Sequence, residues 1–176
     1  RVETGGGSAT AADVIWREVQ LTARVKPIIV SMGSAAASGG YYISTPATRI
    51  FANPLSVTGS IGIFYGKADV SELLTKIGVN VETYKTAPRA DAESIFRPFT
   101  EEERRELERK VGQFYDMFLG RVAEGRRLSK QQVDAVGQGR VWTGEQALRH
   151  KLVDEIGGMR QALATARKLA DLSETA

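Results

Sequence analysis

The 176-residue chain contains no cysteine and only one histidine, His150. The absence of cysteine excludes disulfide bonds, a thiol nucleophile and metal sites built on cysteine. A catalytic triad with an imidazole base would depend on His150 alone. This residue lies at the expected end of a helix, where a cationic side chain is favoured, so we interpret it as a surface residue.

Long apolar runs and a large excess of one charge are also missing. No run approaches the roughly 20 residues that a membrane-spanning helix requires. The 24 Lys and Arg residues are interspersed with 21 Asp and Glu residues, which is not the electrostatic pattern of a nucleic-acid-binding protein. We therefore expect no nucleic-acid partner. The acidic residues do not have the spacing of metal ligands, and we expect neither a metal nor a cofactor.

The remaining pattern alternates between helices and strands. Apolar spacing predicts a helix that follows the Gly5–Gly7 loop and ends before Pro27. The short β-branched run Ile28–Met32 predicts a buried strand, and the small residues after it open a second helix. Further strands are expected at Arg49–Ala52, Gly59–Phe64 and Val79–Tyr84. Further helices are expected at Val70–Ile77, after the capping residues Thr100, Ser129 and Thr143, and from Met159 to about Leu172.

This alternation favours a layered α/β fold. The chain begins with Arg1 rather than Met. We therefore interpret residues 1–176 as one domain, incomplete at its N-terminus, of a longer protein.

Ser38 is the candidate nucleophile. It lies in the run Ala36–Tyr42, at the expected sharp turn between a strand and a helix. At such a turn a hydroxyl is exposed beside backbone N–H groups that the helix leaves unpaired, and these groups can stabilise an oxyanion. The alternative is that the small residues only allow close packing of helix on sheet, and the sequence lacks the G-x-S-x-G pattern that would favour catalysis.

A serine nucleophile needs a base, and a desolvated lysine can supply one. Lys85 follows the expected strand Val79–Tyr84 and is the lysine best placed for burial, although a solvated lysine at a strand end is the simpler interpretation. The Gly5–Gly7 loop precedes a helix and could bind an anion there or form a plain turn. We favour a third role, in which it faces the Ser38 turn and completes an oxyanion hole.

Four motifs occur in a characteristic order along the chain: Ala36–Ile43, Thr58–Gly62, Gly139–Gly144 and Leu152–Asp154. Together with the glycine loop they closely resemble the signal peptide peptidase A, or protease IV, family of membrane-bound serine peptidases. The resemblance extends over nearly the whole chain, which is most similar to the C-terminal copy, bearing the catalytic serine, of members with two tandem copies. It implies a Clp/crotonase-like fold, in which a mostly parallel sheet is flanked by helices.

The resemblance also implies a Ser-Lys dyad that hydrolyses remnant signal peptides or other membrane-associated peptides. Ser38 matches the nucleophile, Lys85 the general base, and Ser60 the serine that orients the lysine. The N–H groups implied for the oxyanion hole belong to Gly39 and to either Gly6 or Gly7. No metal or cofactor is required.

Members of the family form homo-oligomers with active sites between subunits, so the resemblance implies a second copy of the chain as a partner. It also implies a membrane anchor N-terminal to the present sequence and a location at the extracytoplasmic face of the bacterial inner membrane. Two alternatives remain. The chain is a catalytically silent, peptidase-like scaffold, or it is a crotonase-type acyl-CoA enzyme that uses its glycine loops to hold a thioester oxyanion.

Overall fold

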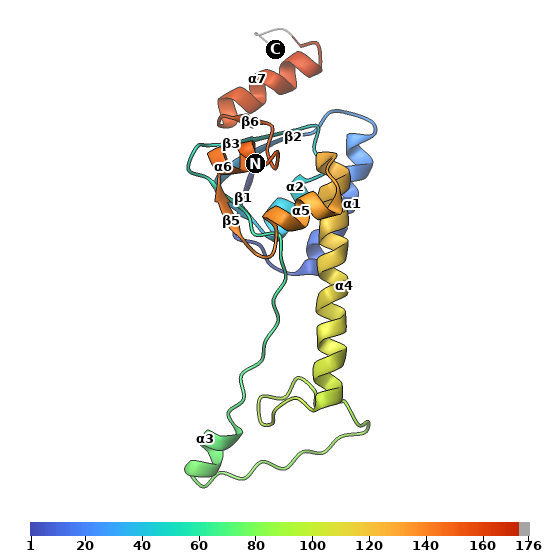
Figure 1. Cartoon of the computed structure of the whole chain (residues 1–176), viewed down its shortest axis with the longest axis vertical. Helices are drawn as coiled ribbons and strands as arrows, with labels where there is room; N and C mark the ends of the chain where they lie inside the picture. The colour runs from blue at the N-terminus through green and yellow to red at the C-terminus, as the bar shows by residue number, and fades with distance from the viewer. Residues whose placement is uncertain (173–176) are drawn as a thin grey trace. The chain divides into compact units, whose positions relative to one another are not determined.

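The computed structural model describes residues 1–172 and divides the chain into two compact units. The first, here called the sheet unit, comprises Arg1–Ile63 and the chain from Phe114 onward. The second, the loop unit, comprises Phe64–Gln113. Helices and strands alternate along the sheet unit (Figure 1), which confirms the predicted α/β class.

The strands within residues 1–172 form a six-stranded sheet in the order β5-β4-β2-β3-β6, with β1 paired to β2. Strand β2 pairs in parallel with β1, β3 and β4, and β3 pairs in parallel with β6. Only β5 is antiparallel to its neighbour among these pairs, so the expected mostly parallel sheet is confirmed. The strands are β1 Val2–Thr4, β2 Ile29–Ala37, β3 Arg49–Ala52, β4 Val57–Gly59, β5 Val141–Thr143 and β6 Glu155–Ile156.

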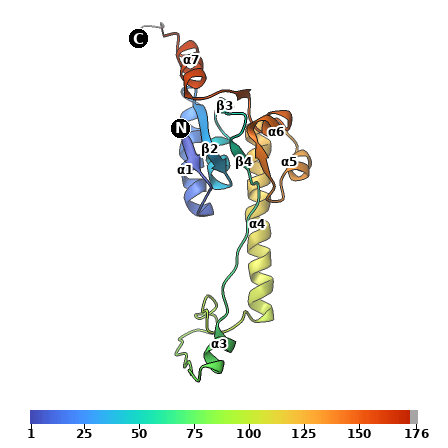
Figure 2. The same ribbon diagram turned by 90° about the vertical axis from the view of Figure 1, so that its left-hand side faces the viewer.

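Helices cover both sides of this sheet. Figure 2 shows α1 and α6 on opposite sides of β2 and β4. Ser129 and Thr143 cap α5 and α6, as the sequence predicts, and each forms a capping box. The helices of the sheet unit are α1 Ala9–Ala23, α2 Gly39–Ser44, α5 Lys130–Val136, α6 Gly144–Arg149 and α7 Met159–Leu169, while α4, Glu101–Arg126, has residues in both units.

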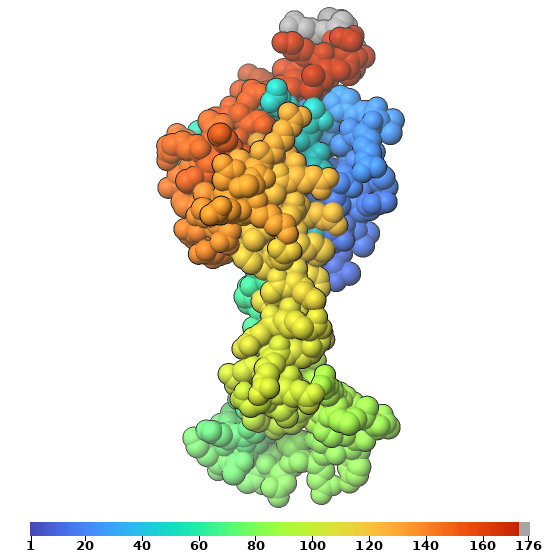
Figure 3. Space-filling view, turned by 45° about the vertical axis from the view of Figure 1, so that its right-hand side comes forward, coloured from blue at the N-terminus to red at the C-terminus, as the bar shows by residue number. Residues whose placement is uncertain are grey.

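An aromatic cluster joins three helices in the core of the sheet unit. The ring of Tyr42 in α2 lies 6.3 Å from that of Trp16 in α1 and 4.9 Å from that of Phe118 in α4. Figure 3 shows α1, in blue, beside the C-terminal part of α4, and here Gln20 donates to Glu124 at 3.1 Å. The start of α2, which carries the Ser38 turn, is therefore held by packed side chains.

The loop unit contains α3, Ser71–Lys76, and the first turns of α4. The capping box at Thr100 is present, because Glu103 accepts from the Thr100 N–H and donates its own N–H to Thr100 Oγ1. The prediction of a strand at Val79–Tyr84 is wrong, since this segment is irregular. The prediction of a strand at Gly59–Phe64, which lies in the sheet unit up to Ile63, is also largely wrong, because β4 ends at Gly59.

The error at Val79–Tyr84 has a physical cause. Alternating apolar residues form a strand only where a neighbouring strand supplies hydrogen-bond partners and an apolar face. In the loop unit Val79 and Val81 remain 46% and 43% exposed. Within the described part of this unit Glu103 is the one residue classed as buried, so the unit has no apolar core of its own. A helix long and apolar enough to cross a membrane is absent from residues 1–172.

Candidate active site

Ser38 occupies the turn between β2 and α2, as the sequence predicts. Its backbone angles are φ 51° and ψ −116°, which a residue with a side chain adopts only when its surroundings enforce them. Its N–H donates to the Gly59 carbonyl at 2.9 Å, and its carbonyl accepts from the Tyr42 N–H at 2.8 Å. Within residues 1–172 the half-buried Ser38 hydroxyl has no hydrogen-bond partner, so it is free to react.

Ser60 lies beside Ser38 at the same edge of the sheet. Strands β2 and β4 run in parallel with Ala37 opposite Gly59, and each serine directly follows one of these residues. Neighbouring strands are about 5 Å apart, so the two serines are close. Ser60 also has a positive φ, 50°, and its N–H donates to the Arg140 carbonyl at 2.8 Å. Sheet pairing therefore brings together two of the candidate residues.

The glycine loop packs directly against the Ser38 turn. A Cβ built on Gly6 would lie 2.8 Å from Ser38 Cβ and 3.1 Å from the Gly39 nitrogen. A Cβ built on Gly39 would lie 3.4 Å from the Gly7 nitrogen. Gly6 also has a φ of 119°, which other residues rarely adopt. The close approach of the two backbones thus requires glycine at position 6.

The N–H groups beside Ser38 are not equally available. The Gly6 N–H donates to Thr4 Oγ1 at 3.2 Å. The Gly7 N–H has no acceptor within the described residues. Gly39 is the first residue of α2, so its N–H has no acceptor inside the helix. Among the candidate oxyanion-hole groups, the N–H groups of Gly7 and Gly39 are therefore free and that of Gly6 is not, whereas the sequence left Gly6 and Gly7 as equal choices.

Lys85 belongs to the loop unit, where its ammonium is already paired. Its Nζ donates to Asp91 Oδ1 at 3.0 Å and to the Pro88 carbonyl at 3.1 Å. The side chain is 39% exposed. The expectation that Lys85 follows a strand and is buried is wrong for the single chain, because the preceding segment forms no strand and packs under no other element of its unit.

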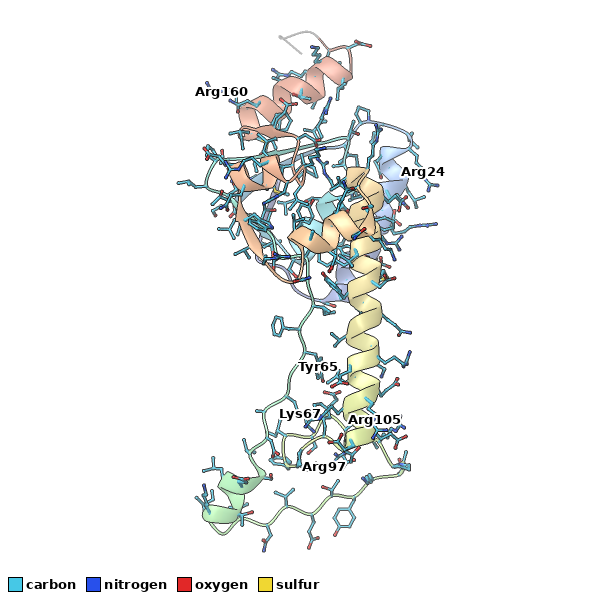
Figure 4. All side chains as sticks on the ribbon, viewed as in Figure 1. Arg24, Tyr65, Lys67, Arg97, Arg105 and Arg160 are labelled. Carbon is cyan, nitrogen blue, oxygen red and sulfur yellow. The ribbon has the colours of Figure 1, made fainter. Side chains whose placement is uncertain are left out.

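Sequence reasoning missed the ionic cluster that Lys85 joins through Asp91. Arg97 contacts Asp91 through two hydrogen bonds, of 2.8 and 2.9 Å, and Glu103 through two more, of 2.8 and 2.7 Å. Figure 4 shows Arg97 beside the first turn of α4. Arg97 and then Lys85 hold the pKa of the Asp91 carboxyl well below its usual range. Arg97, with the Thr100 N–H, lowers the pKa of Glu103 to about 2. The capping box at Thr100 was the one sequence signal that pointed to this cluster.

Other features of the sheet unit do not contribute to this site. The ring of His150 is half-buried and lies 4.4 Å from that of Trp142. A cavity of about 630 Å³ between α1, α4 and α7 is lined by arginines such as Arg24, but by neither Ser38 nor Ser60. Arg24 and Arg126 lie at the C-terminal ends of α1 and α4, where cations are favoured. No group of three or more His, Asp or Glu residues within residues 1–172 is arranged to hold a metal.

The fold and this turn define an α/β protein with a free serine at the carboxyl edge of a parallel sheet, next to unpaired backbone N–H groups. Comparison with known families gives the class a name. The model of "Peptidase family S49" matches residues 20–173, which include Ser38, Ser60 and Lys85 but not the glycine loop. The chain therefore belongs to Peptidase family S49.

Individual relatives support the same assignment. The chain is 42% identical to "Protease 4" of Salmonella typhi over 99% of its length, which is 28% of that protein. It is 39% identical to "Serine protease SPPA, chloroplastic" of Arabidopsis thaliana over 98% of its length, 26% of that protein. It is 41% identical to "Protease 4" of Haemophilus influenzae over 97% of its length, 28% of that protein. The chain thus spans little more than a quarter of these relatives.

Proposed function

We propose that this chain carries the active site of a serine endopeptidase with a Clp/crotonase-like fold, in which Ser38 is the nucleophile and Lys85 the general base. Ser60 orients the lysine amine. The N–H groups of Gly39 and Gly7 bind the oxyanion. Membership of Peptidase family S49 supports the reaction class, and the resemblance of Thr83–Ala87 to the family's lysine motif supports the choice of base.

One observation carries the proposal: Ser38 is held in a positive-φ turn, with a free hydroxyl next to two free N–H donors. A turn of this kind aims a nucleophile at a carbonyl carbon while the donors stabilise the developing negative charge. The free Gly7 N–H favours Gly7 over Gly6 as the second donor, because Gly6 already donates to Thr4.

The chemistry follows from these roles. The neutral Lys85 amine takes the proton from Ser38 Oγ as the oxygen attacks the peptide carbonyl. The tetrahedral intermediate then loses the amine product, which receives that proton from the Lys85 ammonium. Lys85 next removes a proton from water, the resulting hydroxide attacks the acyl group on Ser38, and the serine leaves with a proton returned to it.

We further propose that a second copy of the chain completes the site. In the loop unit the side chains of Phe64 and Tyr84 are 95% and 90% exposed, and Leu73 and Ile77 are 57% and 63% exposed. A unit that exposes its apolar residues and has no core is stabilised when another surface covers them. Tyr84 is adjacent to Lys85, so the same contact would surround the base and remove its amine from solvent.

The substrate class comes from the family resemblance rather than from a pocket. We propose remnant signal peptides or other membrane-associated peptides as substrates. Membrane attachment through a segment outside this chain and an extracytoplasmic location remain predictions.

The proposal is tested by labelling the purified chain with a fluorophosphonate probe. Wild-type protein should be labelled, and Ser38→Ala and Lys85→Ala should each reduce the labelling rate at least a hundred-fold. Lys76→Ala is the matched control, because Lys76 lies in the same unit and has no side-chain partner within residues 1–172. It should be labelled like the wild type.

Thermal unfolding of each variant shows whether it is folded. Labelling of folded Ser38→Ala protein at the wild-type rate would refute Ser38 as the nucleophile. A folded wild-type chain without any labelling would support the scaffold alternative. Binding of an acyl-CoA that Ser38→Ala leaves intact would support the crotonase-type alternative.

A further inference from the structure

The carboxylate of Asp91 is fixed in position next to the base. Lys85 Nζ lies 3.0 Å from Asp91 Oδ1, and the Lys85 side chain is 39% exposed while that of Asp91 is only 10% exposed. Lysine is thus the more solvated member of the pair. It can leave the pair by rotating its flexible side chain, whereas the carboxylate is enclosed by its own loop.

Arg97 is the reason that Asp91 cannot follow. Its Nε and Nη2 contact the two Asp91 oxygens at 2.8 and 2.9 Å, an arrangement that fixes both the position and the plane of the carboxylate. The same guanidinium contacts Glu103 twice, and Glu103 is part of the capping box of α4. The carboxylate that faces Lys85 is therefore anchored to the first turn of a 26-residue helix.

This arrangement conflicts with the role of a base. An ammonium that donates its hydrogens to a carboxylate and a carbonyl has no lone pair with which to accept the serine proton. Arg97 is the other charged group that contacts Asp91, and the Pro88 carbonyl is the other acceptor on Lys85. In the described chain the hydrogen bonds of Lys85 Nζ therefore go to Asp91 and Pro88 and to neither candidate serine.

We propose, building on the function proposed above, that Asp91 is a positioning residue which keeps Lys85 as a paired ammonium until the assembled site draws it away. Arg97 keeps Asp91 in place during this exchange. The lysine leaves the carboxylate when the hydroxyls of Ser38 and Ser60 replace it, and it releases its proton there. Asp91 thus prevents Lys85 from acting as a base before the site is complete.

Asp91→Asn tests this idea, since the amide retains the shape of the side chain and removes its charge. The rate of fluorophosphonate labelling at Ser38 should rise about two- to five-fold near neutral pH, and the acid side of its pH profile should move to lower pH. Glu93→Gln is the matched control, because Glu93 lies on the same loop and bonds to Tyr65 rather than to Lys85. Its profile should coincide with that of the wild type.

A second readout does not depend on catalysis. Acetic anhydride modifies neutral amines, and mass spectrometry gives the modification rate at Lys85 relative to Lys76 in the same sample. We expect Asp91→Asn to raise this ratio about two- to five-fold. A purely structural role for Asp91 would instead lower Ser38 labelling at every pH and leave the shape of the profile unchanged.

The outcomes separate this inference from the proposed function. If Lys85→Ala abolishes labelling while Asp91→Asn changes neither the pH profile nor the acetylation ratio, Asp91 has no such role and the dyad stands. If Lys85→Ala is labelled normally, both ideas fail. If Asp91→Asn does not fold, the ratio of Lys85 to Lys76 acetylation in the wild type tests the proposal. Acetylation of Lys85 at the rate of Lys76 would overturn it, and slower acetylation of Lys85 would support it.

Discussion

The two units hold their candidate catalytic residues by different physical means. In the sheet unit, Ser38 is fixed by strand pairing, by backbone hydrogen bonds and by the close approach of Gly6. In the loop unit, which has no apolar core, Lys85 is held by one ion pair to Asp91, and Arg97 in turn pairs with Asp91 and Glu103. Close-packed interiors allow one arrangement, whereas a lysine that is 39% exposed can leave its ion pair and take another partner.

This difference suits the proposed division of labour. A nucleophile beside an oxyanion hole must keep its geometry to within a fraction of an ångström, because misplacement lowers the rate steeply. A base that comes from a surface loop must instead be able to change partners. The contrast predicts that small steric changes will be severe in the sheet unit and mild in the loop unit.

Two glycines of α4 test this contrast within one helix. A Cβ on Gly125, in the sheet unit, would overlap the carbonyl oxygen of Thr45, whereas a Cβ on Gly112, in the loop unit, would meet nothing within 4 Å. We expect Gly125→Ala to lower the free energy of unfolding by about 3 kcal/mol. Gly112→Ala should raise it by about 0.5–1 kcal/mol, because alanine favours the helix. Urea denaturation of both variants measures the difference, and equal effects would contradict the contrast.

The glycine loop provides the next largest effect. Gly6→Ala places a methyl group 2.8 Å from Ser38 Cβ at a φ of 119°, so the loop must move and carry the Gly7 N–H away from Ser38. We expect Ser38 labelling to fall about ten- to a hundred-fold. Gly5→Ala is the control, since a Cβ there meets nothing within 4 Å and Gly5 has no positive φ. A similar loss in both variants would show that the loop needs only flexibility.

The same contrast explains what could be predicted from the sequence. The Ser38 turn depends on adjacent residues, and the pattern of an apolar strand followed by small residues predicted a strand-to-helix turn there. The predicted strand end at Met32 is wrong, because β2 continues through the small residues to Ala37. The position of Ser60 depends on the pairing of β4 with β2. Local patterns do not determine strand order, so only the family resemblance pointed to Ser60.

The surroundings of Lys85 could not be predicted in this way. The alternation Val79–Tyr84 predicted a strand, but within residues 1–172 no neighbouring strand pairs with it. The partners of Lys85 and Arg97 are charged residues on an irregular loop, and such contacts leave no periodic signal in a sequence. The proposed dyad pairs residues that lie far apart in the sequence, and a local pattern cannot predict such a pairing.

Helix caps in the two units extend the comparison to a smaller effect. Ser129 caps α5, which buries Val133 in the sheet unit, and Thr100 caps α4 in the loop unit. Ser129→Ala should lower the free energy of unfolding by about 1 kcal/mol. Thr100→Ala should mainly increase hydrogen exchange at residues 101–104, with a smaller change in global unfolding. Equal losses of global stability would show that the two units unfold together.

The smallest expected effect is the loss of stability of the loop unit in acid. The pKa values of Asp91 and Glu103 are lowered in the folded chain, to about 2 for Glu103. A carboxyl with a lowered pKa contributes stability above its unfolded pKa, near 4, and this stability is lost as the pH falls through the folded value. Between about pH 4.5 and pH 2, hydrogen exchange at residues 101–104, corrected for its intrinsic pH dependence, should rise about two- to three-fold. Arg97→Gln removes the partner of both carboxylates and should flatten this rise, whereas an unchanged profile would show that the ion pairs do not hold the loop to α4.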